Sequence, residues 1–406
     1  MIPIFYFWGL MLASTLGRLK ILGLPVGIGY PIILLMSVGL FIYHSRAYYL
    51  EFRRHHQAVI IAVALLAFSL LSTLLSSDIT VALRYYVRLI FYILIFFDFL
   101  CILSIQAKDN KQHHIYLKKC LIPKPKIPFL GAWVGFLFVL SLLGMVELFF
   151  PGAWIFTLKY PSFHPRIGSI VQSPNIFGTL MVLGVVNAFY VLKIAFDKSA
   201  VKLIWLVISL FLISIVLSGS RTALLLLLLA AAAYDRTGKS QLLRRSKIII
   251  PAVFVMLLIM IFSRYPELAT GKFTEFYKAA SYFSTSATSR IEIWQVAIQE
   301  FLKAPLVGQG LGIFPEVTGP RVLGWNGSHT HNFFLESAVS LGCIGIILSV
   351  ILIYQVLTVL PKLPKVVAYS LVIILMSQIV DFYFYDLTFA ASSMYMLALA
   401  NFLAKG

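Results

Sequence analysis

The sequence is poor in charge and in cysteine. Only 12% of its 406 residues are charged, whereas 60% are hydrophobic, and soluble domains carry roughly twice that share of charge. The hydrophobic residues form long uninterrupted blocks, which indicate membrane spans rather than the core of a soluble domain. The three cysteines, Cys101, Cys120 and Cys343, lie far apart without C-x-x-C spacing. Neither a disulfide framework nor a zinc site is therefore predicted.

Motifs of several common enzyme classes are also missing. The sequence contains no P-loop, no D-x-D sugar-nucleotide motif and no G-x-S-x-G, so the chemistry of those classes is not expected. The first hydrophobic block follows no basic segment, so a cleaved signal peptide is not expected either.

Twelve hydrophobic blocks are separated by charged residues or by Pro and Gly. They predict an all-α integral membrane protein with about 12 transmembrane helices. Residues 1–263 would hold nine helices with short loops, residues 264–330 a mostly helical polar segment, and residues 331–406 the last three helices. The blocks are residues 3–17, 21–43, 58–75, 85–105, 128–149, 174–196, 203–218, 222–234, 248–263, 331–354, 366–380 and 387–403.

The net charge of +18 follows from the predicted topology. With a cytoplasmic N-terminus, 20 of the 33 Lys and Arg residues fall in cytoplasmic loops beside only four acidic residues, which leaves +16 on that face. This bias is the positive-inside pattern. It places both termini in the cytoplasm and the segment 264–330 on the opposite side. The basic face is expected to contact anionic membrane lipids, and no nucleic-acid binding is predicted.

The polar segment 264–330 contains two predicted helices. One runs from Pro266 to about Tyr282, and the second begins near Arg290. These helices are expected to lie along the membrane surface above a cavity, or to form a small self-contained lid. The apolar face of the second helix would consist of Ile291, Trp294, Ala297, Ile298 and Phe301.

A short hairpin is predicted around Arg221. The apolar run 201–234 is too long for one span and is broken only by Ser218-Gly219-Ser220-Arg221-Thr222. Its second arm has about thirteen residues, or roughly 20 Å, which is shorter than the ~30 Å hydrocarbon slab. Arg221 is therefore expected below the outer surface, where a guanidinium requires a wet cavity or an anion. A snorkelling arginine at a tight turn is the alternative.

Two further groups of residues are candidates for chemistry. Arg290 begins a predicted helix, where it would reinforce an anion bound at the N-terminus, and Trp294 shares its face; a solvated first-turn charge is the alternative. His331 lies where the chain re-enters the membrane. The helix dipole there favours a neutral imidazole that can accept a proton. No carboxylate cluster accompanies His329 and His331, so no metal site is predicted.

Several other polar residues lie in or beside the predicted spans. Arg166 and the pair Pro174-Asn175 lie in the outer loop before the sixth span, where they suggest a turn with a snorkelling arginine. Asp98 lies inside a span and is expected to contact another helix. Asp381 and Asp386 fall in a short outer turn, where they could position a sugar or be solvated.

Arginines in a membrane crevice suit a lipid-linked phosphate or diphosphate. A neutral histidine suits a general base. This combination suggests metal-free group transfer from a lipid carrier.

Several short motifs are considered together. They are Ser289-Arg290-Ile291-Glu292-Ile293-Trp294-x-x-Ala297, Pro305-x-x-Gly308-x-Gly310, His331-Asn332-x-x-Leu335, Leu341-Gly342-x-x-Gly345, Ser218-Gly219-Ser220-Arg221-Thr222, and Arg166 with Pro174-Asn175. Taken together, these motifs resemble the O-antigen ligase/polymerase family. The resemblance spans about residues 160–350, and the length and the modest outer segment are most similar to the ligases of that family.

The resemblance implies a GT-C-like membrane fold and an inverting glycosyl transfer at the periplasmic face of the inner membrane. O-antigen would pass from undecaprenyl pyrophosphate to a lipid A–core sugar, without metal, ATP or another cofactor. Arg221 and Arg290 would bind the pyrophosphate, His331 would deprotonate the acceptor hydroxyl, and Asn332 would orient that hydroxyl or contact sugar. Trp294, Arg166 and Asn175 are further candidate substrate-binding residues.

Other functions remain open at this point. An O-antigen polymerase or a protein O-oligosaccharyltransferase would use the same donor. A secondary transporter with twelve spans is the alternative from a different class, although transporters tend to carry internal repeats and none is found in this sequence.

Overall fold

The computed structural model describes residues 2–16, 27–113, 129–149, 166–171, 173–194, 198–235, 290–324 and 329–405. The chain groups into two compact units, one made of Met1–Phe129 with Arg290–Gly406 and the other of Leu130–Ser289. Within the described ranges every regular element is helical. The predicted span 248–263 and the predicted helix from Pro266 to Tyr282 lie outside the described residues.

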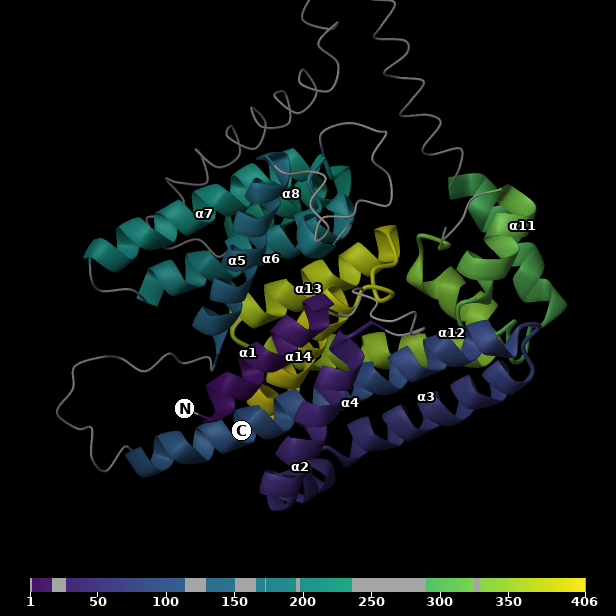
Figure 1. Ribbon diagram of the computed structural model, residues 1–406, viewed down its shortest axis with the longest axis horizontal. Helices are drawn as coiled ribbons and strands as arrows, with labels where there is room; N and C mark the ends of the chain where they lie inside the picture. The colour runs from purple at the N-terminus through teal and green to yellow at the C-terminus, as the bar shows by residue number, and fades with distance from the viewer. Residues whose placement is uncertain are drawn as a thin grey trace, which may run out of the picture. The chain divides into compact units, whose positions relative to one another are not determined.

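The first unit contains most of the helices (Figure 1). Helix α4 packs against α14 and α2, and α1 packs against α2 and α14. The elements are α1 (Ile2–Thr15), α2 (Gly29–Arg54), α3 (His56–Leu74), α4 (Ile79–His113), a helix over residues 290–303, the π-helical η5 (Phe314–Thr318), α11 (Gly319–Leu323), α12 (Phe333–Val359), η6 (Leu360–Lys362), α13 (Lys365–Val380) and α14 (Leu387–Lys405).

The second unit is built around α6, whose middle turns are buried on all sides. Helix α6 packs against α5, α7 and α8. Its elements are α5 (Leu130–Phe149), the 3-10 turn η3 (Ser169–Val171), α6 (Pro174–Ile194), α7 (Lys198–Ser218) and α8 (Arg221–Asp235).

The helices have the length and composition of membrane spans. Eight of the described helices are long and apolar enough to cross a bilayer, and three shorter apolar helices accompany them, at Pro3–Thr15, Arg221–Ala231 and Lys365–Ile379. Every predicted span apart from 248–263 overlaps a described helix, although the helix that overlaps the span 21–43 runs from Gly29 to Arg54. The prediction of an all-α integral membrane protein is confirmed.

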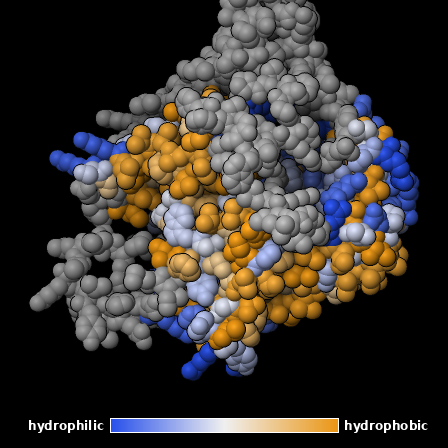
Figure 2. Space-filling model, viewed as in Figure 1, coloured by the Kyte–Doolittle hydropathy of each residue, from blue (hydrophilic) through white to orange (hydrophobic). Residues whose placement is uncertain are grey.

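Apolar side chains remain on the outside of these helices. Ile60 and Leu74 of α3 are 63% and 59% exposed, and Leu35 of α2 is 73% exposed. Figure 2 shows hydrophobic residues spread over the visible surface that these helices contribute. Such a surface suits lipid, because contact with hydrocarbon costs an apolar side chain nothing.

One buried carboxylate inside a span has its partners on a neighbouring helix. Asp98 of α4 is buried and accepts hydrogen bonds from Ser37 Oγ, at 2.5 Å, and from the hydroxyl of Tyr48, both on α2. The expectation that Asp98 contacts another helix is confirmed. The two bonds compensate for the cost of holding a carboxylate away from water.

Helix α12 is kinked at Gly342, which has a φ of 67°. The kink leaves backbone groups free to bond with the glycine-rich segment after residue 303. Gln309 N donates to Val339 O at 2.7 Å, Gly310 N to Ser340 O at 3.1 Å, and Cys343 N to Pro305 O at 2.7 Å. The segment 305–310 and the kink of α12, which are separate motifs in the sequence, are therefore joined by backbone hydrogen bonds.

Substitution of Gly342 by Ala is expected to destabilise the protein by about 2–4 kcal/mol, because the new Cβ adds left-handed backbone strain to overlap with the backbone of Leu306. Gly324 has a similar φ of 70° but open space around it. Gly324→Ala therefore isolates the strain, about 1–2 kcal/mol. Thermal denaturation in detergent measures the loss of stability in Gly342→Ala and in Gly324→Ala. Equal losses in the two variants would contradict the close backbone contact at Gly342.

Candidate functional site

His331 lies immediately before the first turn of α12, as the sequence predicts. The next residue, Asn332, caps this helix, because its Oδ1 accepts from Phe334 N at 3.0 Å and from Leu335 N at 3.1 Å. The backbone of His331 has a φ of 53°, a left-handed conformation that is uncommon for a residue with a side chain. The cap and this turn together place the imidazole beyond the end of the helix.

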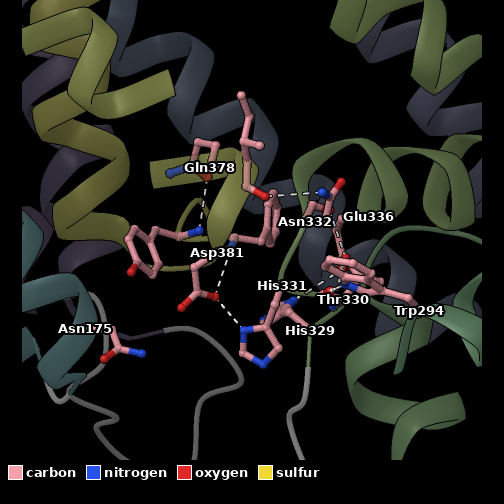
Figure 3. Close-up of polar contacts among 12 residues, drawn as sticks. Asn175, Trp294, His329, Thr330, His331, Asn332, Glu336, Gln378 and Asp381 are labelled. Atoms are coloured by element: carbon pink, nitrogen blue, oxygen red, sulfur yellow. Dashed lines mark hydrogen bonds and ion pairs between the residues drawn. The ribbon is translucent and has the colours of Figure 1, made fainter. Parts of the chain in front are cut away.

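His331 is paired with Asp381, which follows α13 (Figure 3). The distance between His331 Nδ1 and Asp381 Oδ1 is 2.5 Å. The imidazole is about one-third exposed, whereas the carboxylate is almost fully buried. The short bond fixes the plane of the ring and leaves its other nitrogen, Nε2, free of this contact.

The charge state of Asp381 determines the tautomer of His331. Burial raises the pKa of Asp381, but the charge and hydrogen bond of His331, the charge of Arg290 and the Phe382 N–H together lower it below the usual range. Asp381 is therefore ionised at neutral pH and can only accept a hydrogen bond. Nδ1 must then carry the proton, and in the neutral ring Nε2 carries the lone pair.

Asp381 and Asp386 are not solvated. Both carboxylates are buried, at 3% and 1% exposure. Asp386 caps α14, since its Oδ1 accepts from Phe389 N at 2.9 Å. The alternative in which this turn is solvated is therefore wrong for both residues, because the turn folds back onto the helices that flank it.

Thr330 anchors the loop that carries His331. Its N–H and its Oγ1 each lie 3.0 Å from Glu336 Oε2, and its carbonyl accepts from Trp294 Nε1 at 2.9 Å. His329 is turned away from solvent, with its ring stacked on Tyr385 at a centroid distance of 4.2 Å. The loop is therefore held on both sides of His331, and the Trp294 N–H is used for this purpose.

The inner face of the helix over residues 290–303 agrees only in part with the predicted one: Trp294, Ala297 and Phe301 face inward as predicted, whereas Ile291 and Ile298 do not. Ile293 and Ala297 are buried beside Trp294 and Phe301, whereas Ile291 and Ile298 are 53% and 47% exposed. The helix is apolar on two sides, so periodicity could not determine which side faces inward. Its first residue, Arg290, acts electrostatically on Asp381, so its charge reaches the His331 pair.

In the second unit, Arg166 packs against the turn between α7 and α8. Arg166 Nε donates to Ser218 O at 2.7 Å, and its Nη2 donates to Asn175 Oδ1 at 2.8 Å. Ser220 caps α8 by accepting from Ala223 N at 3.2 Å. Arg221 begins α8 with an exposed side chain. The structure therefore brings together the Arg166 loop, Asn175 and the Ser218–Thr222 turn.

Glu147 holds the Arg166 loop from the side of α5. Its Oε2 accepts from Gly168 N at 2.9 Å and from Ser169 N at 2.7 Å, and its side chain is buried. Ser169 has a φ of 52° and donates its Oγ–H to Leu140 O at 2.9 Å. A single carboxylate thus stabilises the strained turn at Gly168 and Ser169, which follows Arg166.

Glu336 and Glu147 are absent from the sequence-based candidates, and for Asp381 the sequence did not predict its contact with His331. Asp381 is fifty positions from His331, Glu336 follows Asn332 by one helical turn, and Glu147 lies inside an apolar block. The sequence feature that could have pointed to these residues is a carboxylate inside or at the end of a predicted span, because such a group requires a partner. Across the described part of the chain, no three His, Cys, Asp or Glu side chains gather in a way that could hold a metal ion.

Comparison with known proteins finds a family model that matches part of the chain. Residues 206–350 match the family model described as O-antigen ligase. This range is less than half of the 406 residues and contains Arg221, Arg290, His331 and Asn332. No curated protein matches the chain.

Replacement of Glu147 by Ala is expected to lower the free energy of unfolding by about 2–5 kcal/mol, because two buried N–H groups lose their acceptor. Glu147→Gln keeps one acceptor oxygen and should cost about 1 kcal/mol. The measurement is thermal denaturation in detergent, with Glu292→Ala at an exposed position as the control. A Glu147→Ala protein as stable as that control would contradict the assigned role.

Proposed function

We propose that this protein transfers O-antigen polysaccharide from undecaprenyl pyrophosphate to a sugar of lipid A–core; the match of residues 206–350 to the O-antigen ligase family model supports the proposal. The reaction would take place at the periplasmic face of the bacterial inner membrane and would need neither metal nor ATP. The observation that carries the proposal is the His331–Asp381 pair at the start of α12, with the charge of Arg290 acting on it.

In this mechanism His331 is the general base. With Nδ1–H donated to Asp381, Nε2 accepts the proton of the acceptor hydroxyl as its oxygen attacks the anomeric carbon. Asp381 then stabilises the imidazolium that forms. The bond from the anomeric carbon to the pyrophosphate oxygen breaks as the new glycosidic bond forms on the opposite face, so the configuration inverts.

The leaving group gains negative charge as that bond breaks. A guanidinium binds a diphosphate with charge-assisted hydrogen bonds that strengthen in the transition state. Arg290 is proposed for this role because its charge acts at the His331 pair. The same role for Arg221, and substrate contacts by Arg166, Asn175 and Trp294, remain predictions from the resemblance. A sugar contact by Asn332 also remains a prediction, beside its use as a helix cap.

The first test is reconstitution. Purified protein, given a polyprenyl-pyrophosphate-linked glycan and lipid A–core, is expected to form the joined product in EDTA and without ATP. The product is measured by gel shift of the acceptor. Absence of product, with a donor and an acceptor that work in a control membrane preparation, would rule out the proposal.

A second test addresses the pair itself. His331→Ala is expected to lower kcat by about 100- to 10,000-fold, the usual contribution of a general base. Asp381→Asn should cost nearly as much, because an amide that donates to Nδ1 moves the ring proton to Nε2. The double variant should be no worse than either single one, since the two residues act as a unit. Asp386→Asn keeps its helix cap and serves as the control, and additive losses would contradict the pair.

The acceptor distinguishes the members of the family. Lipid A–core, a free glycan repeat and a protein acceptor are compared with the same donor. A preference for lipid A–core supports the ligase, a preference for the free repeat indicates an O-antigen polymerase, and a preference for protein indicates an oligosaccharyltransferase.

A further inference from the structure

Helix α4 carries a stripe of polar side chains inside its apolar span. Tyr85, Arg88 and Tyr92 are spaced by three and four residues and so share one face. Arg88 is the tenth residue of α4, which begins at Ile79. At 1.5 Å per residue it lies roughly 14 Å along the helix. This position is within the candidate span Ile79–Lys108, where a charged side chain requires a specific reason.

Among the described residues, no carboxylate forms an ion pair with Arg88. Its guanidinium lies 4.5 Å from the centroid of the Tyr85 ring, a cation–π contact. Glu316 acts on it electrostatically, but this carboxylate is already paired with Arg84, with Nη2 and Oε2 2.7 Å apart. Arg84 and Arg88 therefore share Glu316, whereas the carboxylates of Asp386 and Glu336 act electrostatically on Tyr92 and Tyr85.

Tyr92 adds an unused hydrogen-bond donor on the same face. Its hydroxyl is buried and has no hydrogen-bond partner among the described residues, and it interacts electrostatically with Arg88. A buried hydroxyl without a partner is costly and is rare in folded proteins. An anion beside Arg88 would satisfy both groups, because phosphate oxygens accept from guanidinium and hydroxyl donors alike.

We propose that Arg88 and Tyr92 bind the phosphate of a membrane-embedded lipid. Arginine suits this role because its planar fork matches phosphate oxygens. Side chains on a helix point toward its N-terminus, so the guanidinium is directed back toward the Ile79 end, which the predicted topology places at the outer surface. The inference rests on the proposed function in one respect, namely that a phosphorylated acceptor such as lipid A reaches this unit.

Binding rather than transfer tests the inference, so its failure can be distinguished from failure of the proposed function. Purified full-length protein is incubated in neutral detergent with bisphosphorylated lipid A, with dephosphorylated lipid A or with phosphatidylglycerol. Bound lipid is measured by native mass spectrometry. The variants are Arg88→Gln, Arg88→Lys and Tyr92→Phe, with Arg321→Gln at an exposed position of α11 as the matched control.

Arg88→Gln is expected to weaken binding of bisphosphorylated lipid A by about tenfold or more, and Arg88→Lys by less. Tyr92→Phe should weaken it by a few-fold without loss of folding, because the deleted hydroxyl has no partner among the residues that the structure describes. Binding of dephosphorylated lipid A should not change. Equal, Arg88-dependent binding of phosphatidylglycerol would support the phosphate site and identify bulk lipid as its source. The inference would be overturned if Tyr92→Phe binds the lipid as wild type does and Arg88→Gln either binds it equally well or does not fold.

Discussion

A polar group inside a hydrocarbon layer must find a partner within the protein, and this constraint connects most of the features described above. Asp98 is satisfied by Ser37 and Tyr48. Glu147 accepts two backbone N–H groups of the Arg166 loop. Each buried carboxylate is therefore also a tether, because a partner far away in the sequence must be held where the carboxylate can reach it.

The same constraint explains how an irregular backbone is tolerated next to His331. The kink of α12 at Gly342 exposes carbonyl groups, and the segment 305–310 supplies N–H donors to two of them. Ser72 Oγ adds a third donor, to Ser340 O at 2.7 Å. The glycines allow the two backbones to approach closely. A rigid support is thus formed under the helix whose first turn carries the catalytic candidate.

The charges near His331 are arranged for a reaction that moves a proton and releases an anion. Asp381 is ionised, holds the imidazole and compensates for the positive charge that proton uptake would create. Arg290 lies close enough to act on this carboxylate. Because the pKa of Asp381 is lowered in the folded protein, the His331–Asp381 pair stabilises the fold at pH values above the ordinary carboxyl pKa. This stabilisation is lost as the pH falls through the lowered pKa of Asp381.

The sequence by itself determined the features that depend on neighbours along the chain. The hydrophobic blocks predict the spans, Ser218–Thr222 predicts the break between α7 and α8, and the polar His331-Asn332 pair predicts the start of α12. Only the tertiary structure decided which of the two apolar sides of the helix 290–303 is buried, that Asp381 contacts His331, and that the buried Tyr92 hydroxyl beside Arg88 has no hydrogen-bond partner among the described residues. The physical reason is that these contacts join residues distant in sequence or depend on what already occupies each surface, and hydropathy contains no information on either.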